Sequence, residues 1–473
     1  MYFHQRFIPG LAAYSYLVAD EVSGEAAVID PTRDIGEFVD IARAEGFRIR
    51  HVLETHVHAD FVSGSRELKA LLGDQVTIHS SGMGGDSWTP PYADVVVADG
   101  DVVTLGSIRL QAIHTPGHTV EHISWALFDE GRSVDVPWLV FTGDFLFVGS
   151  VGRPDLLGEE ARKELASQLY SSVFDKLPGL PEFTEVFPGH GAGSLCGKAI
   201  GSRSSSTMGF ERRFNDSLQQ RPQGQWIDEL LSGMPLAPPY FARMKKVNAS
   251  GPVVLGSTLP GQKIFSATEV SEGICEECLV VDARSKEAFA GAHIPGSVNI
   301  PLAPTFANWA GWVLPYDTPL LLVVDDASQM EEVTTHLIRV GFDDIQGFLV
   351  NGVSDWQNEG YPLSSFETIT VEELNRRVSG SVAPFIIDAR TEGEWNSGHI
   401  DGAHHIHTGL IENRIDEIPR DRPVAVICGS GYRGSIAASL LMRHGFNDVA
   451  NVLGGMSAWN AASMRVEVPA SSS

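Results

Sequence analysis

Two histidines and an aspartate alternate along one short loop, and these residue types can hold a metal ion. The segment Thr55-His-Val-His-Ala-Asp-Phe-Val-Ser-Gly64 contains them as His56, His58 and Asp60. It follows Ile49-Arg-His-Val-Leu-Glu54, a short apolar run that predicts a buried strand. Loops at strand ends frequently carry function because a rigid sheet positions them. The pattern therefore predicts a metal site, although an isolated H-x-H in a polar loop would indicate only a solvated surface.

Strands and helices must position this loop, and they alternate through the first 215 residues. Apolar segments predict strands at 16–19, 26–30, 101–105 and 108–113, and helical spacing predicts helices at 35–45, 65–72 and 159–177. This alternation indicates an α/β layered domain. Between about 218 and 262, six prolines interrupt regular structure. That segment is either a tether, partly packed through Trp226, Tyr240 and Phe241, or an ordered helical extension of the first domain.

The composition limits the classes of partner. The chain has 473 residues, which predicts about three domains. Its net charge of −26 makes nucleic acid and anionic membranes poor partners. No charged-then-apolar leader opens the sequence, and no apolar run reaches the ~18 residues of a membrane span. Four cysteines are too few for a disulfide framework. We therefore expect a cytoplasmic protein with reduced thiols.

The last 200 residues contain an internal repeat. Asp282-Ala-Arg matches Asp388-Ala-Arg, and His293-Ile matches His399-Ile, each pair 106 positions apart. Each copy of roughly 100 residues alternates strand and helix. The repeat therefore predicts two related domains, each with a mostly parallel sheet.

More metal-binding residue types follow later strands of the first domain. His118 ends the turn His114-Thr-Pro-Gly-His, Asp144 ends the apolar run that begins at Leu139, and His190 ends Val186-Phe-Pro-Gly-His. The carboxyl ends of strands in a layered fold converge, so we expect these side chains to meet those of the first loop.

These motifs together resemble the metallo-β-lactamase superfamily over about residues 10–215. The usual pattern of that superfamily is H-x-H-x-D-H, and Phe61 stands where the final histidine would be. That histidine normally holds a second metal. Asp60 and His190 remain, but two ligands rarely hold an ion alone. The departure therefore favours one metal ion and counts against a dinuclear hydrolase.

Within the superfamily, persulfide dioxygenases resemble this chain most in their ligand set. The resemblance implies one Fe(II) per chain on His56, His118 and Asp144, a facial set that leaves positions for O₂ and substrate. His58 and His190 then become candidates for hydrogen bonds around the ligands, with Asp60 beside them. The competing interpretation places Zn²⁺ on His56, His58 and His118 with a water. Spacing alone does not separate the two metals.

Two residues near the predicted metal site have two interpretations each. Cys196 lies in a glycine-rich loop six residues beyond His190; it could receive or pass on sulfur, or it could be a small buried filler. Arg153 could bind a substrate carboxylate in bidentate fashion, or it could pair with Asp155 and shape the loop.

The second repeat carries a cysteine loop typical of sulfur transfer. Cys428-Gly-Ser-Gly-Tyr-Arg433 follows the buried strand 424–427 and precedes the predicted helix 434–444. Backbone N–H groups, the helix dipole and Arg433 would favour the thiolate and the persulfide of Cys428. Together with Asp-Ala-Arg and Gly-His-Ile, this loop resembles rhodanese sulfurtransferases over about residues 366–468.

The first repeat lacks this chemistry. Its matching segment, 320–329, has no cysteine or arginine and places two acids in the loop, so we expect an inactive rhodanese-like copy. The isolated Cys275-x-x-Cys278 before it is a weak signal that we interpret as incidental.

The sequence therefore predicts an αββα metallo-β-lactamase-like sandwich followed by two rhodanese-like α/β domains with parallel sheets. The expected parts are a dioxygenase domain with a C-terminal extension (1–245), a linker (246–262), an inactive rhodanese-like domain (263–365) and an active rhodanese domain (366–468). The resemblance implies that a small-molecule persulfide is oxidised with O₂ to sulfite, and that sulfur transfer through Cys428 gives thiosulfate. We also expect a homo-oligomer. The alternatives are a zinc-dependent thioester hydrolase with a rhodanese tail and a non-catalytic sulfur carrier, and the thiol that carries the persulfide stays open.

Overall fold

The computed structural model describes all residues except 274–276, 381 and 469–473. Cys275 therefore lies outside the described residues. The chain divides into two compact units, which are described separately: Met1–Thr258 with Ile338–Gly341, and Leu259–Leu337 with Phe342–Ser473.

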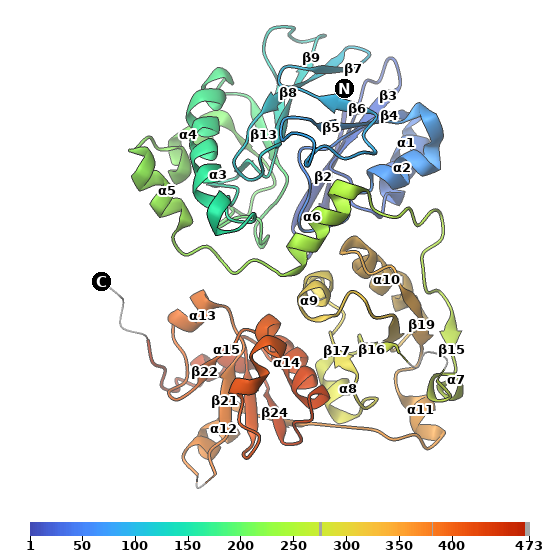
Figure 1. The fold of residues 1–473 in the computed structure, drawn as a ribbon, viewed down its shortest axis with the longest axis vertical. Coiled ribbons are helices and arrows are strands. Elements are labelled where there is room, and N and C mark those ends of the chain that lie inside the picture. Colours follow the sequence, from blue (N-terminus) through green and yellow to red (C-terminus); the bar gives the residue numbers. More distant parts are fainter. Residues whose placement is uncertain (274–276, 381, 469–473) are drawn as a thin grey trace. The chain divides into compact units, whose positions relative to one another are not determined.

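The first unit contains two six-stranded sheets (Figure 1). The first sheet has the order β1 (Tyr2–Ile8), β2 (Ala13–Ala19), β3 (Glu25–Ile29), β4 (Arg48–Leu53), β5 (Thr77–Ser81) and β6 (Val95–Val97). The second has the order β14 (Ser206–Thr207), β13 (Glu185–Pro188), β10 (Leu139–Gly143), β9 (Ile123–Asp129), β8 (Ile108–His114) and β7 (Val102–Leu105). A short hairpin, β11 (Leu146–Phe147) and β12 (Ser150–Val151), follows β10.

The helices of this unit are α1 (Gly36–Glu45), α2 (Ser65–Leu72), α3 (Glu159–Ser171), α4 (Met208–Phe214), α5 (Gln223–Leu231) and α6 (Tyr240–Ser250). Of these, α1 and α3 cover the outer faces of the two sheets, and α6 contacts the loop after β4. Alternating apolar side chains such as Tyr16 and Trp125 fill the space between the sheets. Phe38 of α1 packs with β2 to β4, and Leu169 of α3 packs with β10 and β13. The predicted αββα sandwich is confirmed.

The proline-rich segment after residue 218 is ordered and helical. Trp226 of α5 is buried in the cluster between α3 and the second sheet, and its indole N–H donates to the Ser217 carbonyl. Tyr240 and Phe241 of α6 are also buried. Of the two interpretations, the ordered extension describes this segment. Because α6 ends at Ser250, it runs through the predicted boundary at 245; the division into four parts stays a prediction.

The second unit contains two five-stranded parallel sheets with the same topology (Figure 1). The first has the order β15 (Ile264–Phe265), β19 (Ile345–Leu349), β18 (Leu320–Val323), β16 (Leu279–Asp282) and β17 (Val298–Asn299). The second has the order β20 (Glu367–Ile369), β24 (Val449–Val452), β23 (Val424–Ile427), β21 (Phe385–Asp388) and β22 (His404–His405). The helices are α7 (Ala267–Ser271), α8 (Lys286–Gly291), α9 (Phe306–Val313), α10 (Met330–Arg339), α11 (Ser354–Asn358), α12 (Val371–Val378), α13 (Glu392–Asn396), α14 (Tyr432–Arg443) and α15 (Gly455–Ala461).

The repeated Asp-Ala-Arg motif makes the same contacts in both copies. Arg284 forms an ion pair with Asp282, and Arg390 forms one with Asp388. The closest N···O distance is 2.6 Å in each pair. All four side chains are buried, so each pair ties the end of a central strand to the loop that follows it. The motif therefore specifies the fold of both copies.

Candidate functional site

Three strand ends of the first unit bring two imidazoles and a carboxylate together. His56 follows β4, His118 follows β8, and Asp144 follows β10, so both sheets contribute. One ligand atom from each side chain lies within 4.8 Å of the other two. Nε2 of His56 and Nε2 of His118 are 3.8 and 3.5 Å from Oδ2 of Asp144. The convergence predicted from the strand ends is therefore present.

The three converging atoms are buried and have no hydrogen-bond partner among the described residues. The opposite atom of each side chain is bonded. Nδ1 of His56 lies 2.9 Å from the Thr55 hydroxyl, and Nδ1 of His118 donates to the carbonyl of Arg153 at 2.9 Å. Burial lowers the pKa of both imidazoles well below its usual value, so both rings stay neutral. Both neutral rings are oriented by hydrogen bonds at Nδ1, and their Nε2 atoms are directed at one carboxylate oxygen. This arrangement fits a metal ion.

A tight backbone places Asp144. Gly143 before it has φ +47°, and a Cβ there would lie 2.5 Å from the Thr55 hydroxyl and 2.6 Å from Nε2 of His122. The Asp144 N–H donates to that same His122 nitrogen. A residue other than glycine at this position would push the strand end away from the first loop.

His58 contacts two carboxylates through its Nε2. That atom lies 3.1 Å from Glu54 and 3.2 Å from Asp30, and the ring stacks on Phe61 at 4.3 Å. Burial alone would lower the pKa of His58, but the two carboxylates raise it well above the usual value. Ligand atoms of His58, Asp30 and Glu54 form a separate group, although the His58 ring also lies 4.3 Å from the His56 ring. The competing zinc arrangement of His56, His58 and His118 stays an alternative.

Asp60, His190 and Cys196 form a neighbouring buried group. Nδ1 of His190 lies 2.6 Å from Oδ1 of Asp144, and its Nε2 lies 2.7 Å from Asp60. Burial alone would lower the pKa of His190, but the two carboxylates raise it to about 10. The ligand atoms of the group lie within 4.8 Å of one another, but both ring nitrogens are engaged.

Cys196 is fully buried beside this group. Burial raises the pKa of its thiol well above the usual value, so the sulfur is protonated at neutral pH. A protonated, enclosed thiol is a poor nucleophile. The predicted sulfur-transfer role of Cys196 stays a prediction.

Arg153 is fully engaged within the protein. Its guanidinium pairs with Asp155 through two bonds of 2.7 Å and donates to the carbonyls of Leu195 and Pro235. Only 1% of the residue is exposed. Of the two interpretations, the loop-shaping pair with Asp155 describes this geometry, and the backbone of Arg153 also orients His118.

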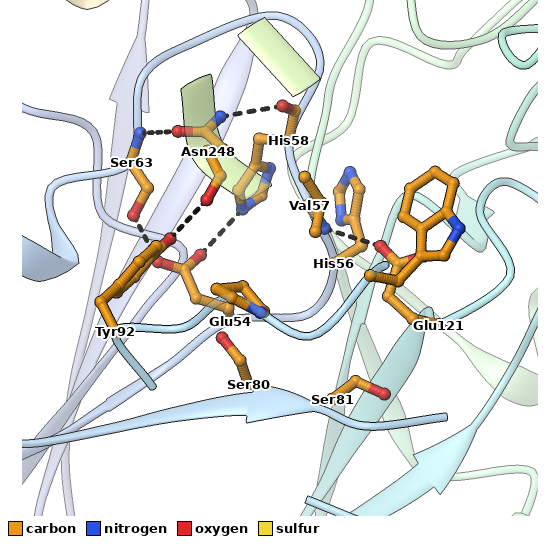
Figure 2. A pocket seen from close by; sticks show the side chains of 12 residues that line it. Glu54, His56, Val57, His58, Ser63, Ser80, Ser81, Tyr92, Glu121 and Asn248 are labelled. Carbon is orange, nitrogen blue, oxygen red and sulfur yellow. Dashed lines mark hydrogen bonds and ion pairs between the residues drawn. The ribbon is translucent and has the colours of Figure 1, made fainter. Parts of the chain in front are cut away.

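Asn248 is a positioning residue that the sequence did not reveal. Its amide nitrogen donates to the carbonyl of His58 at 2.8 Å, and its oxygen accepts from the N–H of Ser63 at 2.9 Å (Figure 2). The same nitrogen also donates to the carbonyl of Phe61 at 2.7 Å. Asp30, also missed, accepts from the N–H and the hydroxyl of Thr55. An asparagine within a helix carries no sequence signal, whereas an acid that ends an apolar run, as Asp30 does, could have been noticed.

The second repeat places Cys428 at the end of β23. The N–H groups of Gly431 and Gly434 donate to its sulfur at 3.1 and 3.3 Å, at the start of α14. Arg433 forms a bidentate pair with Glu394 at 2.6 and 2.7 Å. Burial alone would raise the pKa of Glu394, but Arg433 lowers it to about 2. The loop therefore surrounds the sulfur of Cys428 with two backbone donors, close to a guanidinium that Glu394 holds in place.

The matching loop of the first repeat has no such cradle. Asp325 and Asp326 are exposed, and Asp326 accepts the N–H of Ser328 as a helix cap.

In the described part of the chain, no helix combines the length and apolar character that a membrane crossing requires.

Comparison with known proteins matches each part of the chain to a family. The model for the metallo-beta-lactamase superfamily matches residues 8–190, and that for the rhodanese-like domain matches 266–359 and 370–462. The persulfide dioxygenase ETHE1, mitochondrial, of Bos taurus is 30% identical over 215 residues, which cover 45% of this chain and 74% of the relative. The chain belongs to the metallo-beta-lactamase superfamily and carries two rhodanese-like domains. The predicted resemblance to a fused dioxygenase–sulfurtransferase is thereby confirmed.

Two further relatives show how far the likeness extends. The crystal structure of a metallo-beta-lactamase from Staphylococcus aureus matches with a TM-score of 0.67 and 37% identity, over 74% of this chain and 99% of that one. The cytoplasmic hydroxyacylglutathione hydrolase of Arabidopsis thaliana is 36% identical over 178 residues, or 37% of this chain. The chain spans only 63% of that hydrolase's length.

Proposed function

We propose that the first unit is a persulfide dioxygenase with one Fe(II) held by His56, His118 and Asp144. The observation that carries the proposal is the trio of buried, converging atoms without hydrogen-bond partners. Two imidazoles and one carboxylate on one face suit non-haem Fe(II) and O₂ chemistry. When bound, the ion supplies a place where O₂ and a sulfur anion are activated side by side.

The surrounding residues orient the ligands and exclude water. Thr55 and the Arg153 carbonyl fix the two imidazole rings, and His190 holds the second oxygen of Asp144. All of these groups are buried, which keeps competing reactions with water out of the site. Overall, a persulfide, O₂ and water give the free thiol, hydrogen sulfite and a proton. The terminal sulfur loses four electrons, and O₂ gains them.

We further propose that the active rhodanese domain transfers sulfur through Cys428. The thiolate attacks the outer sulfur of a second persulfide, a new S–S bond forms, and the carrier leaves as a thiolate. Sulfite then attacks the outer sulfur of the Cys428 persulfide, giving thiosulfate and restoring the thiolate. The amide cradle and Arg433 stabilise the anion at each stage. The division into three domains and a linker predicted from the sequence is part of this proposal.

A zinc-dependent thioester hydrolase is the second candidate, because the similarity to a hydroxyacylglutathione hydrolase reaches 36% identity. Two local features favour the dioxygenase. Nε2 of His58 contacts the carboxylates of Glu54 and Asp30, and Phe61 replaces a residue type that could hold a second ion.

Oxygen uptake with several low-molecular-weight persulfides tests the proposal, with sulfite and thiosulfate quantified. We expect O₂ consumption by the wild type and by Cys428→Ser, and loss of thiosulfate only in Cys428→Ser. Asp325→Asn, in the matching loop of the inactive repeat, is the control and should change neither. Stoichiometric zinc without iron, and no O₂ uptake, would support the hydrolase instead. Loss of both activities in Cys428→Ser would contradict the division into two sites.

A further inference from the structure

A narrow pocket lies beside the proposed metal site and shares His56 with it (Figure 2). The volume open to the centre of a water molecule is about 10 Å³, which is room for a single small group. The metal loop, the end of β5, the segment after β5 and α6 all contribute to its walls. The lining residues that matter below are His56, Val57, Ser81, Trp88, Tyr92 and Glu121.

Glu121 brings an unpartnered carboxylate oxygen to this pocket. Only 1% of the residue is exposed. Its Oε1 accepts the N–H of Val57 at 2.8 Å, which places the carboxyl directly behind the metal loop. Its Oε2 is buried and has no hydrogen-bond partner among the described residues. The segment that covers it packs tightly, since a Cβ on Gly84 would lie 2.9 Å from Cβ of Glu121.

A buried carboxylate oxygen needs a donor. Leaving such an oxygen without one is unfavourable, because it loses its bonds to water and gains none in the protein. A ligand that carries an N–H group into the pocket would supply that donor to Oε2 of Glu121. Because Val57 follows His56 directly and its N–H donates to the same carboxylate, that group would lie beside the metal loop.

We propose that this pocket is a recognition subsite for the carrier of the persulfide, and that Glu121 accepts a hydrogen bond from an N–H group close to the carrier's sulfur. The inference rests on the proposed function and names its substrate class as aminothiol derivatives, in which an amide or ammonium nitrogen stands two carbons from sulfur. The pocket has room for the N–H group alone, so the rest of the carrier would lie outside it. Carriers without an N–H donor leave Glu121 unpaired and bind more weakly.

A matched pair of unreactive thiols tests the subsite without turnover. N-Acetylcysteamine and 2-mercaptoethyl acetate differ only in an amide N–H or an ester oxygen at the same position. We would titrate both into the full-length protein under nitrogen by calorimetry. One hydrogen bond to a carboxylate predicts about tenfold tighter binding of the amide by the wild type.

Glu121→Gln should remove or reverse this preference. The Val57 N–H needs an acceptor and takes the glutamine oxygen, so the glutamine NH₂ faces the pocket and favours the ester oxygen. Glu160→Gln, exposed on α3, is the matched control and should keep the tenfold ratio. Metal content, measured for each variant, shows whether the neighbouring site is intact.

Equal binding of the two thiols to the wild type would overturn the proposal and leave water as the partner of Glu121. An unchanged ratio in Glu121→Gln with wild-type metal content would overturn it as well. If that variant does not fold, the wild-type ratio alone still decides. A tenfold preference without any O₂ uptake on persulfides would retain the subsite and remove the dioxygenase reaction, so the two failures are distinguishable.

Discussion

Asn248→Ala should loosen the metal loop without touching a proposed ligand. Asn248 is 2% exposed and makes three hydrogen bonds to the segment from His58 to Ser63, at 2.7–2.9 Å (Figure 2). Alanine removes two donors and one acceptor, and it leaves two buried carbonyls and one N–H unpaired. The substitution alters no other side chain of α6.

The magnitude follows from these three bonds. Each contributes about 1 kcal/mol net, so local closure of the loop loses about 3 kcal/mol. That value corresponds to roughly a hundredfold larger open population. Because the loop carries His56, metal affinity should fall by about 10- to 100-fold, as it does when groups that orient ligands are removed.

Hydrogen exchange read by mass spectrometry measures this opening directly. Exchange in a peptide covering residues 55–64 should accelerate about a hundredfold in Asn248→Ala, while peptides from the strand core stay unchanged. Ser250→Ala is the matched control, since Ser250 is exposed on the same helix and bonds only within it. Acceleration below threefold, or equal acceleration throughout the first unit, would refute the reasoning.

Three further predictions concern charge and metal. His190→Leu leaves the buried carboxylates of Asp60 and Asp144 without their shared partner. The free energy of unfolding of the first unit, measured by urea denaturation, should therefore fall by about 3–5 kcal/mol. A fall of less than about 1 kcal/mol would contradict this prediction. The pKa of Glu394 lies at about 2, below its usual 4.5, so its stabilising pair with Arg433 is present above about pH 4.5 and is lost as the pH falls toward 2. Exchange in residues 391–397 should rise over that range in the wild type but not in Glu394→Gln. Removing the metal with a chelator should lower the melting temperature of the first unit and leave the transition of the second unit in place, as two calorimetric peaks would show.

Much of the site could be predicted because strand ends converge. His56, His118 and Asp144 each lie shortly after a predicted strand, and a layered fold brings such strand ends together. The direction of His58 could not be predicted, because the carboxylates that bind it come from other segments. The role of Asn248 could not be predicted for the same reason, because its three partners lie about 190 positions earlier in the chain.

The repeat illustrates what a matching motif does and does not specify. Asp282–Arg284 and Asp388–Arg390 make the same buried contacts, so their recurrence predicted the shared fold correctly. Chemistry depends instead on the loop after the next strand, where only the second copy has Cys428 and its amide donors. Similar scaffolds therefore carry different proposed roles in one chain.

The central claim is a single ion held by one carboxylate and two imidazoles. Anomalous diffraction from crystals of the metal-loaded protein, collected on both sides of the iron edge, tests it most directly. We expect one iron peak per chain, bounded by Nε2 of His56, Nε2 of His118 and Oδ2 of Asp144. Two peaks, with the second beside Asp60 and His190, or a peak at the zinc edge alone, would contradict it.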